Sequence, residues 1–198
     1  MKIYRLFFKR VSDVFFSLLV IAIFLPLFIC LYFLVKIDSK GPFFFYQERL
    51  GYKGKVFKVF KIRTMTDKKR IVHQEIFKDN VEVTRVGKVL RRLKLDELPQ
   101  LINILIGDMG IVGPRPGLLS QLPELNEDGV IRLNVRPGLT GLAQVNGNIY
   151  LTWEQRWVYD RKYVEELSML LDLKIVLKTC ALLLHGEEKF IKKPEQNG

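Results

Sequence analysis

The chain has 198 residues, a length that suits one compact domain with an appendage. Its formal net charge of +11 requires negative partners or surroundings, such as nucleic acid, anionic lipid or phosphorylated substrates. The chain holds two histidines, and its two cysteines, Cys30 and Cys180, lie in apolar stretches without ligand or disulfide spacing. This composition argues against a zinc site and favours a reducing, cytoplasm-facing location.

The first expected element is an apolar stretch over residues 14–35 that no charged residue interrupts. It is long enough to cross a hydrocarbon core of about 30 Å. A secretory signal peptide fits poorly, because the run is too long and a basic segment follows it without a small-residue cleavage site. We therefore expect a retained membrane element.

Pro26 lies near the middle of this stretch, where a proline must kink or break a helix. Basic residues occur on both flanks, and positive charge prefers the cytoplasmic side of a membrane. They are Lys2, Arg5, Lys9 and Arg10 before the run, and Lys36, Lys40, Arg49, Lys53 and Lys55 after it. A re-entrant hairpin would place both flanks on one side. An ordinary spanning helix with a tolerated proline is an equal alternative at this point.

The remaining chain has the mixed composition of a folded domain. Residues 42–47 and 56–62 are aromatic and β-branched around a Gly-rich turn at 51–54, which predicts a short β-hairpin. Residues 67–83 are polar and irregular, so we expect a loop there. Helical spacing begins at Val86, and a second helix is expected from about Pro99 to Leu105, ended by Gly107. Residues 170–184 predict a core or interfacial helix that is too short to form another span.

These elements predict an α+β fold: a helix-rich domain with a short β-hairpin, anchored by the N-terminal membrane helix. The expected divisions are residues 1–36 for the membrane element, 37–185 for the domain with its interfacial amphipathic helices, and 186–198 for a polar tail.

Asp96 and Glu97 are the strongest candidates for chemistry. Pro99 suits a first helical turn, which places both carboxylates at a helix N-terminus, where backbone donors favour the ionised form. Helix capping is the simpler interpretation from local sequence. The functional interpretation is that an ionised Asp beside Mg²⁺ attacks phosphorus while its neighbour holds the metal.

Two arginine turns follow, at residues 113–117 and 135–139, in which proline and glycine flank Arg115 and Arg136. A rigidly presented guanidinium suits bidentate binding of phosphate oxygens. Further cations and amides complete the candidate set, although each is common as an ordinary surface or turn residue. They are Lys61, Arg63 and Arg91 as phosphate ligands, and Gln144 and Asn146 as side chains that could read a base edge.

An ordered set of short blocks resembles the bacterial sugar transferase family, the monotopic phosphoglycosyl transferases. The blocks cover residues 60–65, 95–100, 107–109, 113–116, 136–141, 144–147, 159–160 and 171–174. Each block alone is weak, but their order and spacing are highly specific.

The resemblance implies a re-entrant helix broken at Pro26 and a catalytic domain on the cytoplasmic face of the bacterial inner membrane. The family often has serine before this proline, where this chain has Leu25. It further implies that Asp96 attacks the sugar-linked phosphorus of a UDP-sugar and releases UMP, with Glu97 as acidic partner and Mg²⁺ nearby. Polyprenyl phosphate would then attack the aspartyl intermediate and leave as polyprenyl-diphosphate-sugar. Arg115 is the first choice of phosphate ligand, followed by Arg91 and Arg136.

Two other classes remain as alternatives. The charge would suit a membrane-anchored nucleic-acid-binding protein, but no nucleic-acid motif is present, so we expect no nucleic-acid partner. A non-catalytic scaffold of a glycan-assembly complex would not need the intact Asp96-Glu97 pair. The expected partners are UDP-sugar, polyprenyl phosphate and membrane lipid. The sequence leaves open whether the chain forms a homodimer and which sugar it transfers.

Overall fold

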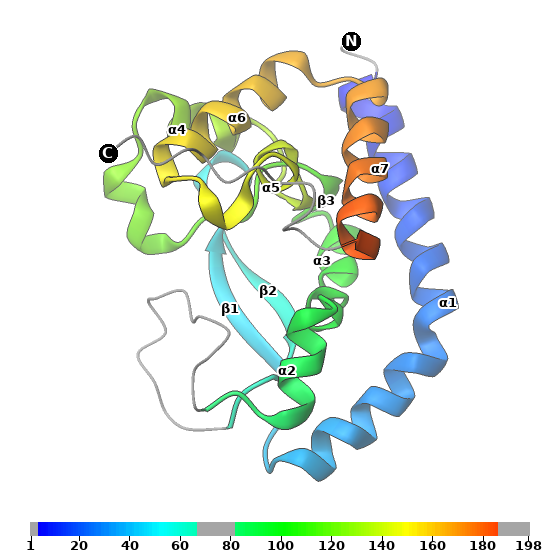
Figure 1. The fold of residues 1–198 in the computed structure, drawn as a ribbon. Coiled ribbons are helices and arrows are strands. Elements are labelled where there is room, and N and C mark those ends of the chain that lie inside the picture. Colours follow the sequence, from blue (N-terminus) through cyan, green and yellow to red (C-terminus); the bar gives the residue numbers. More distant parts are fainter. Residues whose placement is uncertain (1–3, 67–81, 186–198) are drawn as a thin grey trace.

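The computed structural model describes residues 4–66 and 82–185. A π-helical turn at Tyr4–Phe8 leads into α1, Lys9–Asp38, which runs along one side of the molecule (Figure 1). Of the helices in this part of the chain, α1 alone is long and apolar enough to cross a membrane. It is helical throughout, including at Pro26, and its axis changes direction partway along (Figure 1). A proline inside a helix is a common cause of such a bend.

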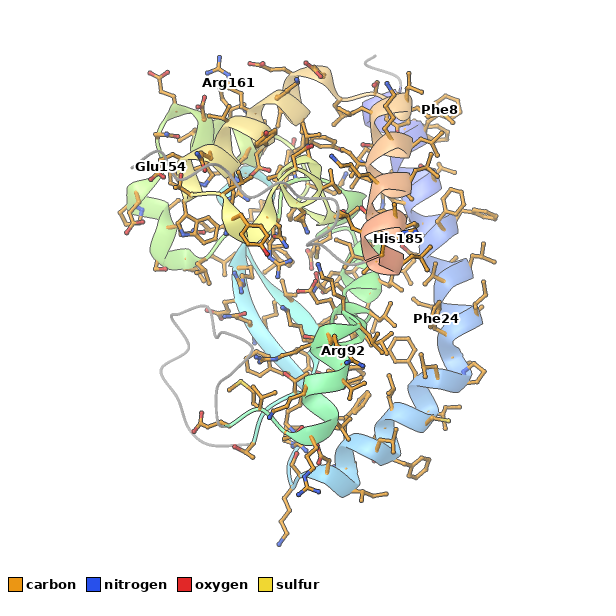
Figure 2. The ribbon with its side chains drawn as sticks, in the orientation of Figure 1. Phe8, Phe24, Arg92, Glu154, Arg161 and His185 are labelled. Carbon is orange, nitrogen blue, oxygen red and sulfur yellow. The ribbon has the colours of Figure 1, made fainter. Side chains whose placement is uncertain are left out.

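The outer side of α1 carries an exposed apolar surface. Phe8, which directly precedes the helix, projects away from the body of the molecule in Figure 2. The exposed side chains along the helix include Val11, Phe15, Phe16, Leu18, Leu19, Ile23, Leu25, Ile29, Phe33, Leu34 and Ile37. Exposed leucines of α7, Met169–His185, add to the apolar surface of the molecule. Soluble proteins rarely expose so much contiguous apolar area, so a membrane-associated helix is the direct interpretation.

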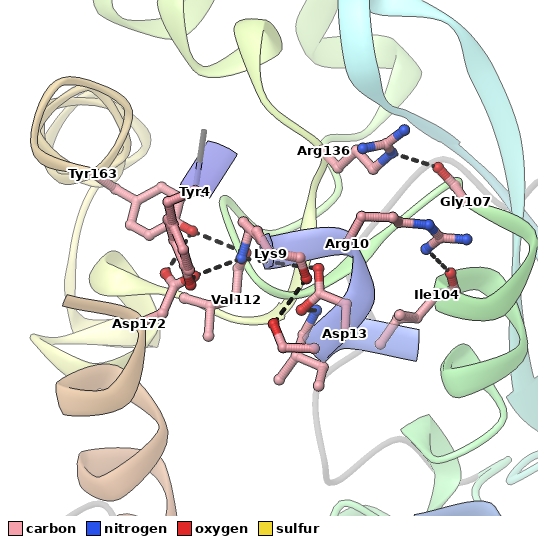
Figure 3. A network of polar contacts seen from close by, with 12 residues as sticks. Tyr4, Lys9, Arg10, Asp13, Ile104, Gly107, Val112, Arg136, Tyr163 and Asp172 are labelled. Carbon is pink, nitrogen blue, oxygen red and sulfur yellow. Dashed lines mark hydrogen bonds and ion pairs between the residues drawn. The ribbon is translucent and has the colours of Figure 1, made fainter. Parts of the chain in front are cut away.

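Both ends of α1 are fixed to the remainder of the protein. Near its start, the Lys9 ammonium lies 2.7 Å from the Asp172 carboxylate of α7, and Asp13 accepts a hydrogen bond from the Ile111 backbone (Figure 3). Tyr163 donates to the same Asp172 carboxylate, at 2.8 Å. Near its end, Leu31 packs in a buried apolar cluster that also contains the following side chains: Val35, Phe43, Ile62 and Leu90.

The predicted hairpin is confirmed. β1, Phe44–Leu50, pairs antiparallel with β2, Val56–Ile62, and a 3₁₀ turn at Tyr52–Gly54 joins them. The loop predicted at 67–83 lies outside the described residues except at its end. There Thr66 donates to the Glu82 carbonyl, which brings the two flanks of the undescribed segment together. The predicted tail at 186–198 is also outside the described residues.

Two short helices follow near their predicted positions. α2 spans Arg85–Arg92, and the Thr84 side chain caps its N-terminus. α3 spans Gln100–Ile106 and ends at Gly107, whose φ of 100° explains why glycine stands there. Asp96 and Glu97 lie in a separate 3₁₀ turn, Leu95–Glu97, just before α3, rather than in its first turn.

The second half wraps around a small parallel sheet that the sequence did not indicate: β3, Gly110–Val112, beside β4, Gly138–Thr140. The backbones approach so closely that a Cβ at Gly138 would lie 2.1 Å from the Gly113 nitrogen. The helical segments of this half are η4 Leu119–Glu124, α4 Glu127–Ile131, η5 Arg132–Asn134, α5 Leu142–Val145, η6 Asn148–Tyr150, α6 Trp153–Glu166 and α7. An apolar cluster of Val112, Val135, Val145, Tyr163 and Ile175 joins β3, α5, α6 and α7.

Candidate active site

The backbone before α3 presents the two adjacent carboxylates. Lys94 takes a left-handed conformation with φ of 55°, which ends the α2 segment and redirects the chain into the turn at Leu95–Glu97. Pro99 then begins α3. Asp96 and Glu97 are therefore held between two structured segments, and both side chains are partly buried.

Glu97 is fixed by two cations from distant parts of the chain. Its Oε1 lies 3.0 Å from Lys61 Nζ and 2.8 Å from Arg115 Nη2. Burial alone would raise the pKa of this carboxyl, but the charges and hydrogen bonds of Arg115 and Lys61 outweigh burial and hold the pKa well below its usual range. Glu97 is therefore an oriented carboxylate that is ionised at neutral pH.

Asp96 has a different environment. Burial, and then the negative charge of Glu97, raise its pKa above the usual value, while Lys61 and Arg91 act against this rise. Among the described residues no ion pair engages the Asp96 carboxylate, so its oxygens are not committed to a cation of the protein. The two neighbouring carboxylates therefore differ: Lys61 and Arg115 hold Glu97 in ion pairs, whereas no ion pair among the described residues holds Asp96.

Lys61 reaches Glu97 because β2 is fastened to α3. Asn103 of α3 is fully buried; it donates to the Lys58 carbonyl at 2.8 Å and accepts from the Phe60 backbone nitrogen at 3.0 Å. One amide side chain thereby satisfies two backbone groups of the strand. This contact sets the position of Lys61 relative to the turn that carries the carboxylates.

Arg115 lies in the loop that follows β3. Arg132 donates a hydrogen bond to the Arg115 carbonyl and forms a buried ion pair with Asp160, at 2.9 Å. Burial raises the pKa of Asp160 to about 6, although Arg132 opposes the rise. The Arg132–Asp160 ion pair therefore helps to fix the backbone of the loop at Arg115. We assigned them no role from sequence, although Asp160 lies in one of the blocks that carry the resemblance.

The other predicted site residues divide into two groups. Arg91 lies close enough to act on the Asp96 pKa, and its Nε donates to Thr64 Oγ1 at 2.8 Å. Gln144 lines a hollow that Arg115 also lines. The remaining three bind elsewhere: Arg63 to Ser39, Arg136 to the Gly107 carbonyl (Figure 3), and Asn146 to Lys178. For these three, a role in substrate binding stays a prediction.

A small hollow, with room for about one water molecule, lies beside Arg115. Its walls come from α5, η6 and α6 as well as the Arg115 loop. The lining includes Arg132, Gln144, Trp153, Arg156, Trp157 and Asp160. The α6 residues were missed in the sequence, although Thr152 and Gln155 form a capping box whose spacing marks the start of this helix.

A magnesium ion fits the carboxylate pair. Magnesium is commonly bound through one or two carboxylates, with substrate phosphates and water as the other ligands. Burial is the main cause of the raised Asp96 pKa, and the repulsion from Glu97 that adds to it is what a divalent cation would relieve. Larger groups of three or more His, Cys, Asp or Glu side chains suited to a metal do not occur among residues 4–66 and 82–185.

Comparison with known proteins adds independent findings. Residues 4–186 match the family described as Bacterial sugar transferase. The chain is 43% identical to the uncharacterized sugar transferase EpsL of Bacillus subtilis over 77% of this chain and 75% of the relative. It is 40% identical to the exopolysaccharide production protein ExoY of Rhizobium meliloti, over 86% of this chain and 83% of that relative. It is also 40% identical to a UDP-glucose:undecaprenyl-phosphate glucose-1-phosphate transferase of Caulobacter vibrioides, over 92% of this chain and 72% of that relative.

Proposed function

The chain belongs to the bacterial sugar transferase family, and on that premise we propose that it transfers glucose 1-phosphate from UDP-glucose to undecaprenyl phosphate. The products are undecaprenyl-diphosphate-glucose and UMP, and the reaction begins the assembly of an exopolysaccharide. The observation that carries the proposal is the unequal pair: an uncommitted Asp96 beside a Glu97 held by Lys61 and Arg115.

In the first half of the reaction, an Asp96 oxygen attacks the sugar-linked phosphorus. The bond between this phosphorus and the bridging oxygen breaks, and UMP leaves with that oxygen. Asp96 then carries the sugar phosphate as a mixed anhydride. In the second half, an oxygen of undecaprenyl phosphate attacks the same phosphorus, and the Asp96 carboxylate is restored. The two anionic substrates therefore need never meet directly.

The surrounding residues stabilise charge. Arg115 is directed at the carboxylates from the β3 side and Lys61 from the β2 side, so both cations can approach phosphate oxygens placed over Asp96. Magnesium, when bound by Asp96 and Glu97, would neutralise charge on the diphosphate. Two cations already lower the basicity of Glu97, which makes it the weaker nucleophile of the pair and leaves the attack to Asp96.

The proposed membrane arrangement is a re-entrant α1 with the domain on the cytoplasmic face of the inner membrane. Support comes from the two ends of α1, which contact the same domain through Lys9–Asp172 and through the Leu31 cluster. At 1.5 Å per residue, a straight spanning helix would carry its ends to opposite sides of the membrane. The basic residues on both flanks favour one side as well.

The activity is tested with the full chain in nanodiscs, Mg²⁺ and undecaprenyl phosphate. We expect UMP release from UDP-glucose that disappears in Asp96→Asn and persists in Asp128→Asn, a carboxylate of α4 that is paired with Arg161. Without the lipid acceptor, intact-mass measurement should find wild-type protein heavier by one sugar phosphate. Release of UDP in place of UMP would contradict the mechanism. UMP release from another UDP-sugar alone would change the donor and leave the mechanism in place.

The topology is tested by cysteine labelling in a background without Cys30 and Cys180. Lys2→Cys and Lys40→Cys should both react with an impermeant maleimide in inverted inner-membrane vesicles and stay unreacted in right-side-out vesicles. Labelling of the two positions from opposite sides would establish a spanning helix instead.

A further inference from the structure

The hollow beside Arg115 contains two polar atoms that the protein leaves without partners. Gln144 Oε1 and Trp157 Nε1 are shielded from solvent, and neither has a hydrogen-bond partner among the described residues. Both side chains line the hollow. Buried polar atoms are nearly always paired, so two such atoms at one hollow indicate that a ligand or an ordered water completes them.

The chemistry of the two atoms is defined. The Gln144 amide donates through Nε2 to the Leu139 carbonyl at 3.0 Å, which leaves Oε1 as an acceptor. A Cβ at Gly141 would lie 2.9 Å from Oε1, so the glycine makes room for this orientation. Trp157 Nε1 can act only as a donor. Gln144 and Trp157 therefore offer one acceptor and one donor, beside the guanidinium donors of the arginines in the same lining.

The edge of a uracil ring has the complementary pattern, because its N3–H donor stands between two carbonyl acceptors. We propose that the hollow receives the uracil of the donor nucleotide, with Gln144 Oε1 accepting from N3–H and Trp157 Nε1 donating to a ring carbonyl. This inference rests on the proposed function, since it assigns the base subsite of that reaction. Cytosine, whose N3 is an acceptor, would place two acceptors against each other at Gln144.

The position of the hollow agrees with this assignment. Arg115 lines it and also contacts Glu97, so a nucleotide with its base in the hollow has its diphosphate directed past Arg115 toward the carboxylates. The partly exposed rim is aromatic and cationic: the Arg156 guanidinium lies 4.2 Å from the centre of the Trp153 ring. Aromatic rings and guanidinium planes are the surfaces on which bases stack. The hollow must widen to admit the ring, and Arg156, which is partly exposed at the rim, is the side chain whose displacement would open it.

The experiment measures binding of UMP, N3-methyl-UMP and CMP to the full chain in nanodiscs by calorimetry. Wild-type protein should bind UMP about tenfold or more tightly than either analogue, because each analogue leaves the Gln144 acceptor unpaired or opposed. In Gln144→Ala the ratio of the analogue Kd to the UMP Kd should fall toward one. Gln155→Ala, the same change on the exposed part of α6, should keep it. Trp157→Phe should weaken UMP binding while the penalty for N3-methylation remains.

Equal binding of UMP and N3-methyl-UMP by wild-type protein would overturn the base subsite and assign the two atoms to an ordered water. That comparison needs no variant, so misfolding of Trp157→Phe would not remove the test. The proposed function fails differently: no UDP-sugar would release UMP. If UDP-glucose and its N3-methyl analogue are turned over equally well, the transferase activity is supported and only the uracil subsite is contradicted.

Discussion

Glu97 and Arg115 are 18 residues apart in the chain, and their side chains meet at 2.8 Å between Oε1 and Nη2. This contact joins the turn before α3 to the loop after β3, and it directs a guanidinium toward the carboxylate pair of Asp96 and Glu97. Lysine keeps the charge but not the planar fork, so Arg115→Lys should lower kcat/KM by on the order of a hundredfold. UMP release measured over a range of UDP-glucose concentrations checks this. Arg161→Lys, a surface arginine paired with Asp128 and Glu165, should be nearly neutral.

Lys61 and Lys58 lie on the same strand and offer a matched comparison. Lys61→Met removes one of the two cations that neutralise Glu97, so turnover should fall tenfold or more. Lys58 is exposed, so Lys58→Met should retain turnover close to that of the wild type. Equal losses in the two variants would show that general positive charge on β2, rather than the ion pair, is what matters.

The elements with local signals were predicted well. The hairpin follows from aromatic and β-branched runs around a Gly-rich turn, and the end of α3 follows from Gly107. The partners of Glu97 could not be predicted, because Lys61 is 36 residues away and only the folded backbone brings the two together. Arg136 illustrates the same limit: proline and glycine beside it predict a rigid turn but not its direction, and its guanidinium binds the Gly107 carbonyl.

Asn103 should be essential for stability. Asn103→Leu leaves the Lys58 carbonyl and the Phe60 nitrogen without partners in a buried position, so the free energy of unfolding should fall by roughly 2–6 kcal/mol. Chemical denaturation followed by circular dichroism measures this loss. Ile102→Ala, on a partly exposed position of the same helix, should cost less than about 1 kcal/mol. A small effect of Asn103→Leu would mean that water replaces the amide.

Gly87 allows α2 to approach the end of the hairpin. A Cβ at this position would lie 2.1 Å from the Thr64 carbonyl oxygen, so Gly87→Ala must push α2 away. Arg91 would then lose its hydrogen bond to Thr64 and its proximity to Asp96. We expect lower thermal stability and lower turnover together. Val89→Ala, an exposed position on the same helix, should change neither by much; an unaltered Gly87→Ala enzyme would contradict the close packing.

Asp160 should give stability a measurable pH dependence. Between its unfolded pKa of 3.8 and its folded pKa of about 6, the folded chain holds a proton that the unfolded chain has lost. The free energy of unfolding should therefore fall as the pH rises through this window, by about 3 kcal/mol from this group. The Asp160→Asn side chain cannot titrate, so this variant should lack the part of the pH dependence of unfolding free energy that comes from Asp160. Denaturation midpoints of both proteins from pH 4 to 7 provide the comparison, and parallel curves would place the Asp160 pKa near its ordinary value.

The two attachments of α1 have a consequence for how the protein can be made and handled. Leu31 and Val35 complete the cluster that holds Ile62 and Leu90, and Asp13 satisfies a backbone nitrogen of β3. Helix α1 is therefore also part of the buried core of the protein. Deleting it to obtain a freely soluble catalytic fragment would open that interior to water. Because α1 precedes these segments in the chain, it is present during synthesis before the residues that pack against it.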